Sequence, residues 1–162
     1  MNVFTLVHVV ISLLAIATGL VVVFGLLTGK PLDRWTAVFL ATTVATSATG
    51  FGFPADRVLP SHIVGGVSLV LLAAAIYARY ARHLAGVWRP VYAAAAVSAL
   101  YLNLFVLVAQ AFLRVPALRA LAPTQSEPPF QVAQLVLLAI AVLVGVAATI
   151  RFRRAPGAVA HA

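Results

Sequence analysis

Cysteine is missing from this chain of 162 residues, which excludes disulfides, thiolate metal sites, iron–sulfur clusters and cysteine nucleophiles. Acidic residues are nearly as scarce: Asp33, Asp56 and Glu127 are the only three. The apolar pattern places all of them in connections, so a carboxylate proton relay within a membrane lacks its residues. Because HExxH, Gly-rich phosphate-loop and GxSxG motifs are also absent, the sequence predicts no hydrolase or transferase; an electron-transfer role stays open.

Long apolar runs dominate what is present. Hydrophobic residues make up 64% of the chain and charged residues 9%, and the mean hydropathy is +1.10. A helix of about 20 apolar residues spans a bilayer. We therefore predict an all-α integral membrane bundle of five transmembrane helices in one domain, residues 1–154, followed by a flexible tail, 155–162. The predicted spans are Val3–Thr28, Trp35–Phe51, Ser61–Tyr80, Val91–Leu113 and Phe130–Ile150.

Basic residues punctuate the spans and predict their orientation. If successive spans alternate in direction, eight basic residues lie on one side and three on the other, and the richer side is expected to be cytoplasmic. This places the N-terminus outside and the C-terminus inside. The predicted partner is the lipid bilayer and not nucleic acid, because the basic residues form no patch interleaved with aromatics. The richer side has Lys30, Arg34, Arg79, Arg82, Arg89, Arg151, Arg153 and Arg154; the other has Arg57, Arg114 and Arg119.

Two similar hairpins suggest an internal repeat. His8 opens the first span and His62 the third, while Trp35 and Trp88 begin the second and fourth. The spacing predicts that the first two helices repeat as the next two, with the fifth added outside the repeat. In addition, the apolar start of the longest loop, Val115–Leu121, is expected to form a short helix at the membrane interface.

The polar residues of the spans gather near the predicted outer leaflet. His8 and His62 lie there at similar depth, and further ligand-pocket candidates are Thr46, Ser47, Asn103, Gln110, Gln131 and Gln134. An ordinary reading exists for each: hydroxyls usually bond their own helix, Asn103 can join helices, and interfacial histidines and glutamines can be solvated.

The histidines suggest the most specific chemistry. If the first and third helices are diagonal, two neutral imidazoles can supply both axial ligands of a b-type haem. Haem b is therefore the candidate cofactor, with His8 and His62 as its binding residues. No other metal is predicted, because two histidines without a carboxylate or thiolate make a weak zinc site.

Three stretches carry a resemblance: Thr46–Pro54, Leu59–Leu69 and Ala122–Phe130. With the spans between them, the chain resembles a family of small uncharacterised bacterial polytopic inner-membrane proteins, which implies an inner-membrane location and supplies no activity. His8–Gly19 and His62–Ser68 are loosely similar to membrane b-type cytochrome domains. Such domains often carry further histidine pairs, which this chain lacks.

Three functions remain open from sequence. One is a haem- or ligand-binding redox protein using the outer polar site. Another is a small-solute channel or carrier, using the hydroxyl-rich second span and Asn103. The last is a non-enzymatic assembly or accessory subunit of a membrane complex, or a homo-oligomer, using the Pro-rich loop and the small-residue grooves.

Overall fold

The computed structural model describes residues 2–53 and 60–154, and every regular element within these ranges is a helix. The predicted all-α class is therefore confirmed. Asp56, Arg57 and the expected flexible tail lie outside the described residues. The elements are α1 (Val3–Leu27), α2 (Asp33–Gly50), α3 (Pro60–Ile76), the π-helix η1 (Tyr77–Ala81), α4 (Trp88–Arg114), α5 (Pro116–Leu121) and α6 (Pro128–Arg154).

Four helical stretches of the described ranges are long and apolar enough to cross a membrane, and they indicate a bilayer environment. They are Val3–Leu27, Ser61–Ala81, Trp88–Arg114 and Pro128–Arg154. The second predicted span is also helical, but α2 is only 18 residues long, begins with Asp33 and Arg34, and is rich in threonine. Its lower apolar content separates it from the other four.

Threonine is compatible with α2 because the helix itself satisfies the hydroxyls. Thr42, Thr43 and Thr49 each donate to the carbonyl four residues earlier, at 2.7 Å. A hydroxyl bonded in this way exposes little unsatisfied polarity to apolar surroundings. For these three residues, the hydroxyl groups therefore bond the backbone of their own helix, as threonines in helices usually do.

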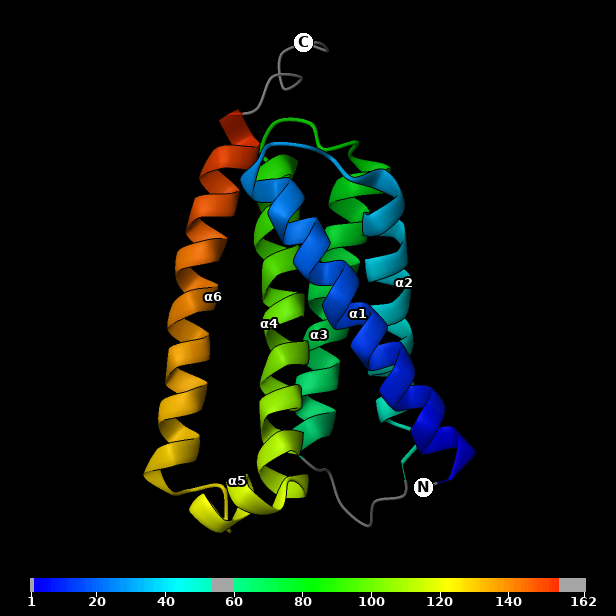
Figure 1. Ribbon diagram of the computed structural model, residues 1–162. Helices are drawn as coiled ribbons and strands as arrows, with labels where there is room; N and C mark the ends of the chain where they lie inside the picture. Colours follow the sequence, from blue (N-terminus) through cyan, green and yellow to red (C-terminus); the bar gives the residue numbers. More distant parts are fainter. Residues whose placement is uncertain (1, 54–59, 155–162) are drawn as a thin grey trace.

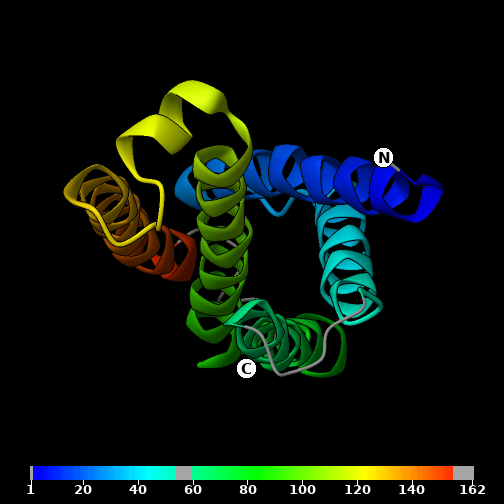
Figure 2. The same ribbon diagram turned by 90° about the horizontal axis from the view of Figure 1, so that it is seen from below.

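The first four long helices form a ring. Neighbours in the chain are neighbours in space, α4 closes the ring against α1, and α1 and α3 are diagonal (Figures 1 and 2). α6 lies outside the ring, packed on α4 and α1. We call the end with the start of α1 and the end of α2 the histidine end, at the bottom of Figure 1. The opposite end, with Asp33, η1 and Arg154, is the arginine end.

Local signals set the helix limits. The Asn2 side chain caps α1 by accepting a hydrogen bond from the Thr5 backbone N–H at 2.8 Å. α1 gives way to a turn in which Gly29 has a φ of 71°, a value that favours glycine. Val115 is extended because the proline that follows it disfavours helical backbone, so α4 ends there. The short helix predicted after α4 is confirmed: it is α5, which begins at Pro116.

Close helix contact in the ring depends on small residues. A Cβ added to Gly19 of α1 would lie 2.8 Å from both Leu100 Cδ1 of α4 and Phe39 Cε2 of α2. Leu100 and Phe39 are buried, so this layer joins three helices. Packing of this kind substitutes for the hydrophobic driving force that is missing between helices in lipid. In contrast, many apolar side chains of α6 are exposed on its outer side, as expected for a lipid-facing helix.

Two expectations about charged residues are wrong. Asp33 is not in a connection: it is the first residue of α2, where the positive end of the helix dipole stabilises a carboxylate. Arg79 was counted among the basic residues that punctuate the spans, but the helical chain continues through η1 and buries it at 9% exposure. The aliphatic stem and aromatic neighbours of Arg79 compensate for part of its desolvation.

Candidate functional site

His8 is held against α2 by a hydrogen bond. Its Nδ1 lies 2.7 Å from Thr49 Oγ1, which also lies 2.7 Å from the Ala45 carbonyl oxygen. If the single Thr49 hydroxyl proton is donated to Ala45, Thr49 accepts from His8, and a neutral imidazole carries its proton on Nδ1 and its lone pair on Nε2. This is the arrangement found in histidine ligands of metals, where the second nitrogen donates to an orienting acceptor.

His62 reaches α2 from the other flank. Its imidazole stacks on the ring of Phe51, with the centroids 5.5 Å apart and the planes 14° from parallel. Phe53 contacts His8 edge-on at 5.0 Å. Both imidazoles are thus placed against the C-terminal end of α2, from two helices that are diagonal in the ring. Gly65 permits the close approach of Phe51, whose Cε2 would lie 3.2 Å from an added Cβ.

Two glycines leave space beside the histidines. A Cβ built on Gly66, one helical turn after His62, has no heavy atom within 4 Å, and one built on Gly50 meets only His8 Cε1 at 4.0 Å. A flat group can approach a helix closely only where side chains are small. Two imidazoles, two small residues and the aromatic rings of Phe51 and Phe53 are therefore the groups available to a flat ligand at this end.

Three of the other predicted candidates face neighbouring helices of the ring or its interior. Ser47 is buried and donates to Ser68 of α3 at 3.1 Å. Thr46 Oγ1 and Asn103 Nδ2 are buried without a hydrogen-bond partner among the described residues. Buried polar atoms without a hydrogen-bond partner are uncommon in folded proteins. The region between the histidine end and the middle of the ring therefore holds polar groups that nothing described here satisfies.

The glutamines are placed elsewhere. Gln110 is exposed and accepts from Arg114 Nε at 3.0 Å, and Gln131 donates to the Ser126 carbonyl at 2.7 Å. Gln134 donates to the Phe105 carbonyl at 3.1 Å and so joins α6 to α4, outside the ring, while its Oε1 is buried and unpartnered. The structure therefore does not bring the three glutamines together with the two histidines into one group.

Metal sites built from several protein ligands are absent from the described residues. Within residues 2–53 and 60–154, no three His, Asp or Glu side chains lie close enough to hold an ion together.

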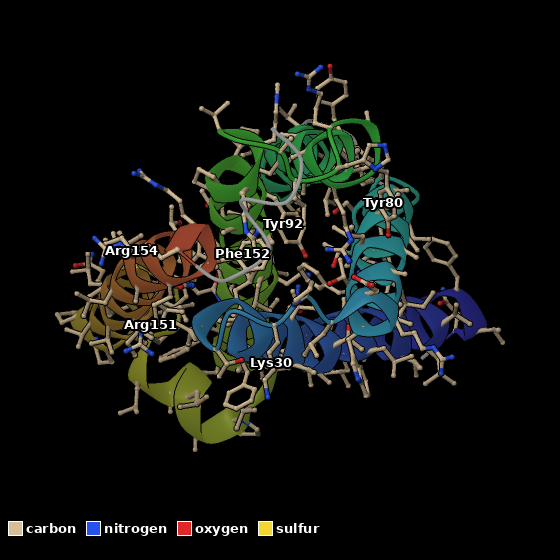
Figure 3. The ribbon with its side chains drawn as sticks, turned by 90° about the horizontal axis from the view of Figure 1, so that it is seen from above. Lys30, Tyr80, Tyr92, Arg151, Phe152 and Arg154 are labelled. Carbon is tan, nitrogen blue, oxygen red and sulfur yellow. The ribbon has the colours of Figure 1, made fainter. Side chains whose placement is uncertain are left out.

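A second polar region, at the arginine end, was not anticipated from sequence. Arg79 Nη2 forms an ion pair with Asp33, and the guanidinium lies over the Tyr92 ring at 5.4 Å from its centroid. The Tyr92 hydroxyl is in turn 3.2 Å from Thr36 Oγ1, in the buried interior that Figure 3 shows from this end. The sequence does contain a signal for the burial of Arg79. Leu72, Ala75 and Arg79 are spaced three and four residues apart, so they share one face of a helix, and Leu72 and Ala75 are buried.

A second buried arginine ties α6 to the ring at the same end. Arg89 Nε donates to the Phe152 carbonyl at 2.8 Å, and its guanidinium lies 4.5 Å from the Phe152 ring centroid. In Figure 3, Phe152 lies near the centre of this end, whereas Arg151, Arg154 and Lys30 lie at the periphery. Arg89 therefore has a structural role that fully accounts for its burial.

Two cavities are described, and neither is lined by a histidine of the histidine end. One is an apolar groove of about 380 Å³ between α4 and α6, which includes Val97, Tyr101 and Gly145. The other, of about 560 Å³, lies at the arginine end beside Arg79.

In comparisons with known proteins, no family model, no curated protein and no solved structure matches the chain.

Proposed function

We propose that this is a multi-pass membrane protein that binds one b-type haem at its histidine end, with His8 and His62 as axial ligands, and that it serves in electron transfer. The observation that carries the proposal is the hydrogen bond between His8 Nδ1 and Thr49 Oγ1: with the Thr49 hydroxyl donating to Ala45, the imidazole would keep Nε2 as its lone-pair nitrogen. When bound, a haem supplies one-electron redox chemistry; the chain's own residues orient and enclose it.

The arrangement of the two histidine-bearing helices supports a single site. α1 and α3 are diagonal in the ring, and both imidazoles contact the same end of α2. Two ligands on opposite helices can bind one iron from its two faces, whereas ligands on one helix cannot. Phe51 and Phe53 then provide apolar contacts, and the open space at Gly66 accommodates part of a flat ring.

The channel alternative receives less support from the hydroxyl groups. Thr42, Thr43 and Thr49 are bonded to their own helix, and Ser47 is bonded to Ser68. A water-lined path needs hydroxyls that are available to a solute. Thr46 Oγ1 and Asn103 Nδ2 have no hydrogen-bond partner among the described residues and are available to a solute. Two such atoms on different helices are sufficient to bind one ligand or water molecule, but they do not line a continuous path.

The proposal includes α2 as a fifth crossing, with the histidine end outside. α2 extends alongside its neighbours from the arginine end to the histidine end (Figure 1). Its 18 residues correspond to about 27 Å at about 1.5 Å per residue, close to the thickness of a bilayer core. The excess of arginine and lysine at the other end supports a cytoplasmic location for that end in a bacterial inner membrane.

Absorption spectroscopy tests the haem proposal directly. Protein purified in detergent from haem-replete cells is expected to show a Soret band and, after reduction with dithionite, the sharp bands of a low-spin haem. His8→Ala and His62→Ala should each abolish the low-spin spectrum. His83→Asn is the control, because it removes a histidine at the arginine end while asparagine tolerates the φ of 49° at that position. A colourless wild-type preparation contradicts the proposal.

A second variant tests the predicted space. Gly66→Leu fills the open volume one turn from His62 without removing either ligand, so haem occupancy should fall while the protein remains folded. Gly66→Ala, which adds only a methyl group, is the matched control and should retain most of the haem. Equal haem content in both variants would place the haem away from this face of α3.

A further inference from the structure

The cavity at the arginine end combines positive charge with access from one side of the bundle. Its volume is about 560 Å³. Arg79 is buried beside it, whereas Arg34 is exposed at its edge. Three segments build the cavity: the start of α2, the π-helix η1 and the turn that follows. The lining residues are Asp33, Arg34, Ala37, Arg79, Tyr80, His83 and Leu84.

Arg79 is only partly satisfied by the protein. Nη2 is paired with Asp33, a side chain that is itself 79% exposed. Nη1 is buried and has no hydrogen-bond partner among the described residues. A buried donor on a charged group is costly to leave unpaired, and the Tyr92 ring against the guanidinium offsets part of that cost. An oxygen of an anion is the natural acceptor for a guanidinium.

The backbone around Arg79 is unusual in two respects. η1 is a π-helix, and π-helical turns are frequent at functional sites. Directly after it, His83 and Leu84 have φ values of 49° and 58°, in the left-handed region that non-glycine residues seldom adopt. A hydrogen bond from the Leu84 backbone N–H to the Ala78 carbonyl, at 3.0 Å, holds this turn. The strained turn places His83 and Leu84 in the wall of the cavity.

We infer that this cavity is a binding site for a phosphate group. Arg79 and Arg34 supply two guanidiniums against the single carboxylate of Asp33, so the lining has an excess of positive charge. The planar fork of a guanidinium matches the oxygens of a phosphate, and a small movement of the Arg79 side chain would present the buried Nη1 to the cavity. His83, in the same wall, contributes a further ring nitrogen.

Two sources can supply this phosphate. One is the headgroup of an anionic lipid, because basic cavities near the ends of membrane helices bind such headgroups. The other is a soluble phosphate that enters from the aqueous phase. Both use the same contacts, so the same variants test them, and the form of the probe distinguishes the sources. The site is independent of the haem proposal, since it lies at the opposite end of the ring.

The experiment measures binding to the purified full-length protein in two formats. In nanodiscs, retention of phosphatidylglycerol against phosphatidylcholine is measured by native mass spectrometry. In detergent, thermal stabilisation by inorganic phosphate is measured against chloride at equal ionic strength. Arg79→Lys keeps the charge but loses the fork, and Arg34→Gln removes an exposed charge at the cavity edge. Arg154→Gln, which removes a charge at the same end outside the cavity, is the matched control.

We expect Arg34→Gln and Arg79→Lys each to weaken binding on the order of tenfold, and Arg154→Gln by less than about twofold, because only the first two remove a guanidinium from the cavity lining. Variant-sensitive retention of phosphatidylglycerol identifies a lipid headgroup, and variant-sensitive stabilisation by inorganic phosphate identifies a soluble ligand. The inference is overturned if neither probe binds, or if Arg154→Gln weakens binding as much as Arg34→Gln. Arg34→Gln keeps the test valid if Arg79→Lys fails to fold.

Discussion

The tautomer of His8 follows from the direction of a single hydroxyl proton and can be measured without any cofactor. Thr49 Oγ1 lies 2.7 Å from both the Ala45 carbonyl oxygen and His8 Nδ1, and donation to Ala45 predicts that Thr49 accepts from His8. Thr49→Val keeps the shape of the side chain but removes the acceptor, so the preference for a proton on Nδ1 should fall. A neutral hydrogen bond contributes about 1 kcal/mol, which corresponds to about a fivefold change in the tautomer ratio.

Thr42→Val is the matched control. Thr42 lies on the same helix, and its hydroxyl likewise donates to the carbonyl four residues earlier at 2.7 Å, but its other contact is only with the Phe39 carbonyl. The two substitutions therefore make the same local change, and only one of them removes a partner of His8. The contrast between the two variants isolates the contact with His8 from the general effect of replacing threonine in α2.

Nitrogen-15 NMR of histidine-labelled protein, recorded above the pKa of free imidazole so that the ring is neutral, reports the tautomer of His8. We expect a protonated Nδ1 in the wild type and in Thr42→Val, and a shifted ratio in Thr49→Val. If haem is present, Thr49→Val should also weaken its retention, since loss of a partner to a ligating histidine costs about 10–100-fold in metal affinity. Identical tautomer ratios in the two valine variants would refute the assigned direction of the hydrogen bond.

Two further predictions concern stability and pH. Gly19→Ala should destabilise the protein by about 1–3 kcal/mol, because the added methyl group would lie 2.8 Å from Leu100 and Phe39; Gly66→Ala, which meets nothing, should be neutral or slightly stabilising. Unfolding in mixed detergent measures both, and equal effects would contradict the packing described. Desolvation acts to raise the pKa of Glu127, but hydrogen bonds from the turn before α6 hold it below the ordinary value of 4.5. The ionised carboxylate therefore stabilises that turn above this value, and the stabilisation is lost as the pH falls through the lower, folded pKa. Hydrogen exchange of the turn amides should accelerate over that acidic range in the wild type and show no such transition in Glu127→Gln.

The helical class and most span limits could be predicted because they depend on local sequence alone. α1 was expected at Val3–Thr28 and is observed at Val3–Leu27, and the short helix after Val115 was anticipated from its composition. Apolar runs of this length have few alternatives in a bilayer, where backbone groups must be satisfied within the helix. α2 is not among the four helices that are apolar enough to cross a membrane, because its threonines lower its apolar content. The hydroxyls of Thr42, Thr43 and Thr49 are nevertheless satisfied by carbonyls of the same helix.

The site could be predicted only as a list of residues at similar depth. Depth along a helix follows from residue counting, so similar depths were expected for His8 and His62, and their rings contact Phe53 and Phe51 just after the end of α2. Rotation about each helix axis does not follow from counting. For this reason the sequence could not show that Gln134 joins α6 to α4 outside the ring.

Sequence by itself determined the environment of this protein, its helical elements and the scarcity of acidic and thiol chemistry, since these follow from composition and apolar run length. Only the tertiary structure decided which side chains meet: that His8 is hydrogen-bonded to Thr49, that Phe51 stacks on His62, and that Arg79 is buried against Asp33. The physical reason is that such contacts join residues 11 to 46 positions apart (8 and 49, 51 and 62, 33 and 79). Their geometry depends on how whole helices pack in the ring, and small residues such as Gly19 and Gly65 set that packing.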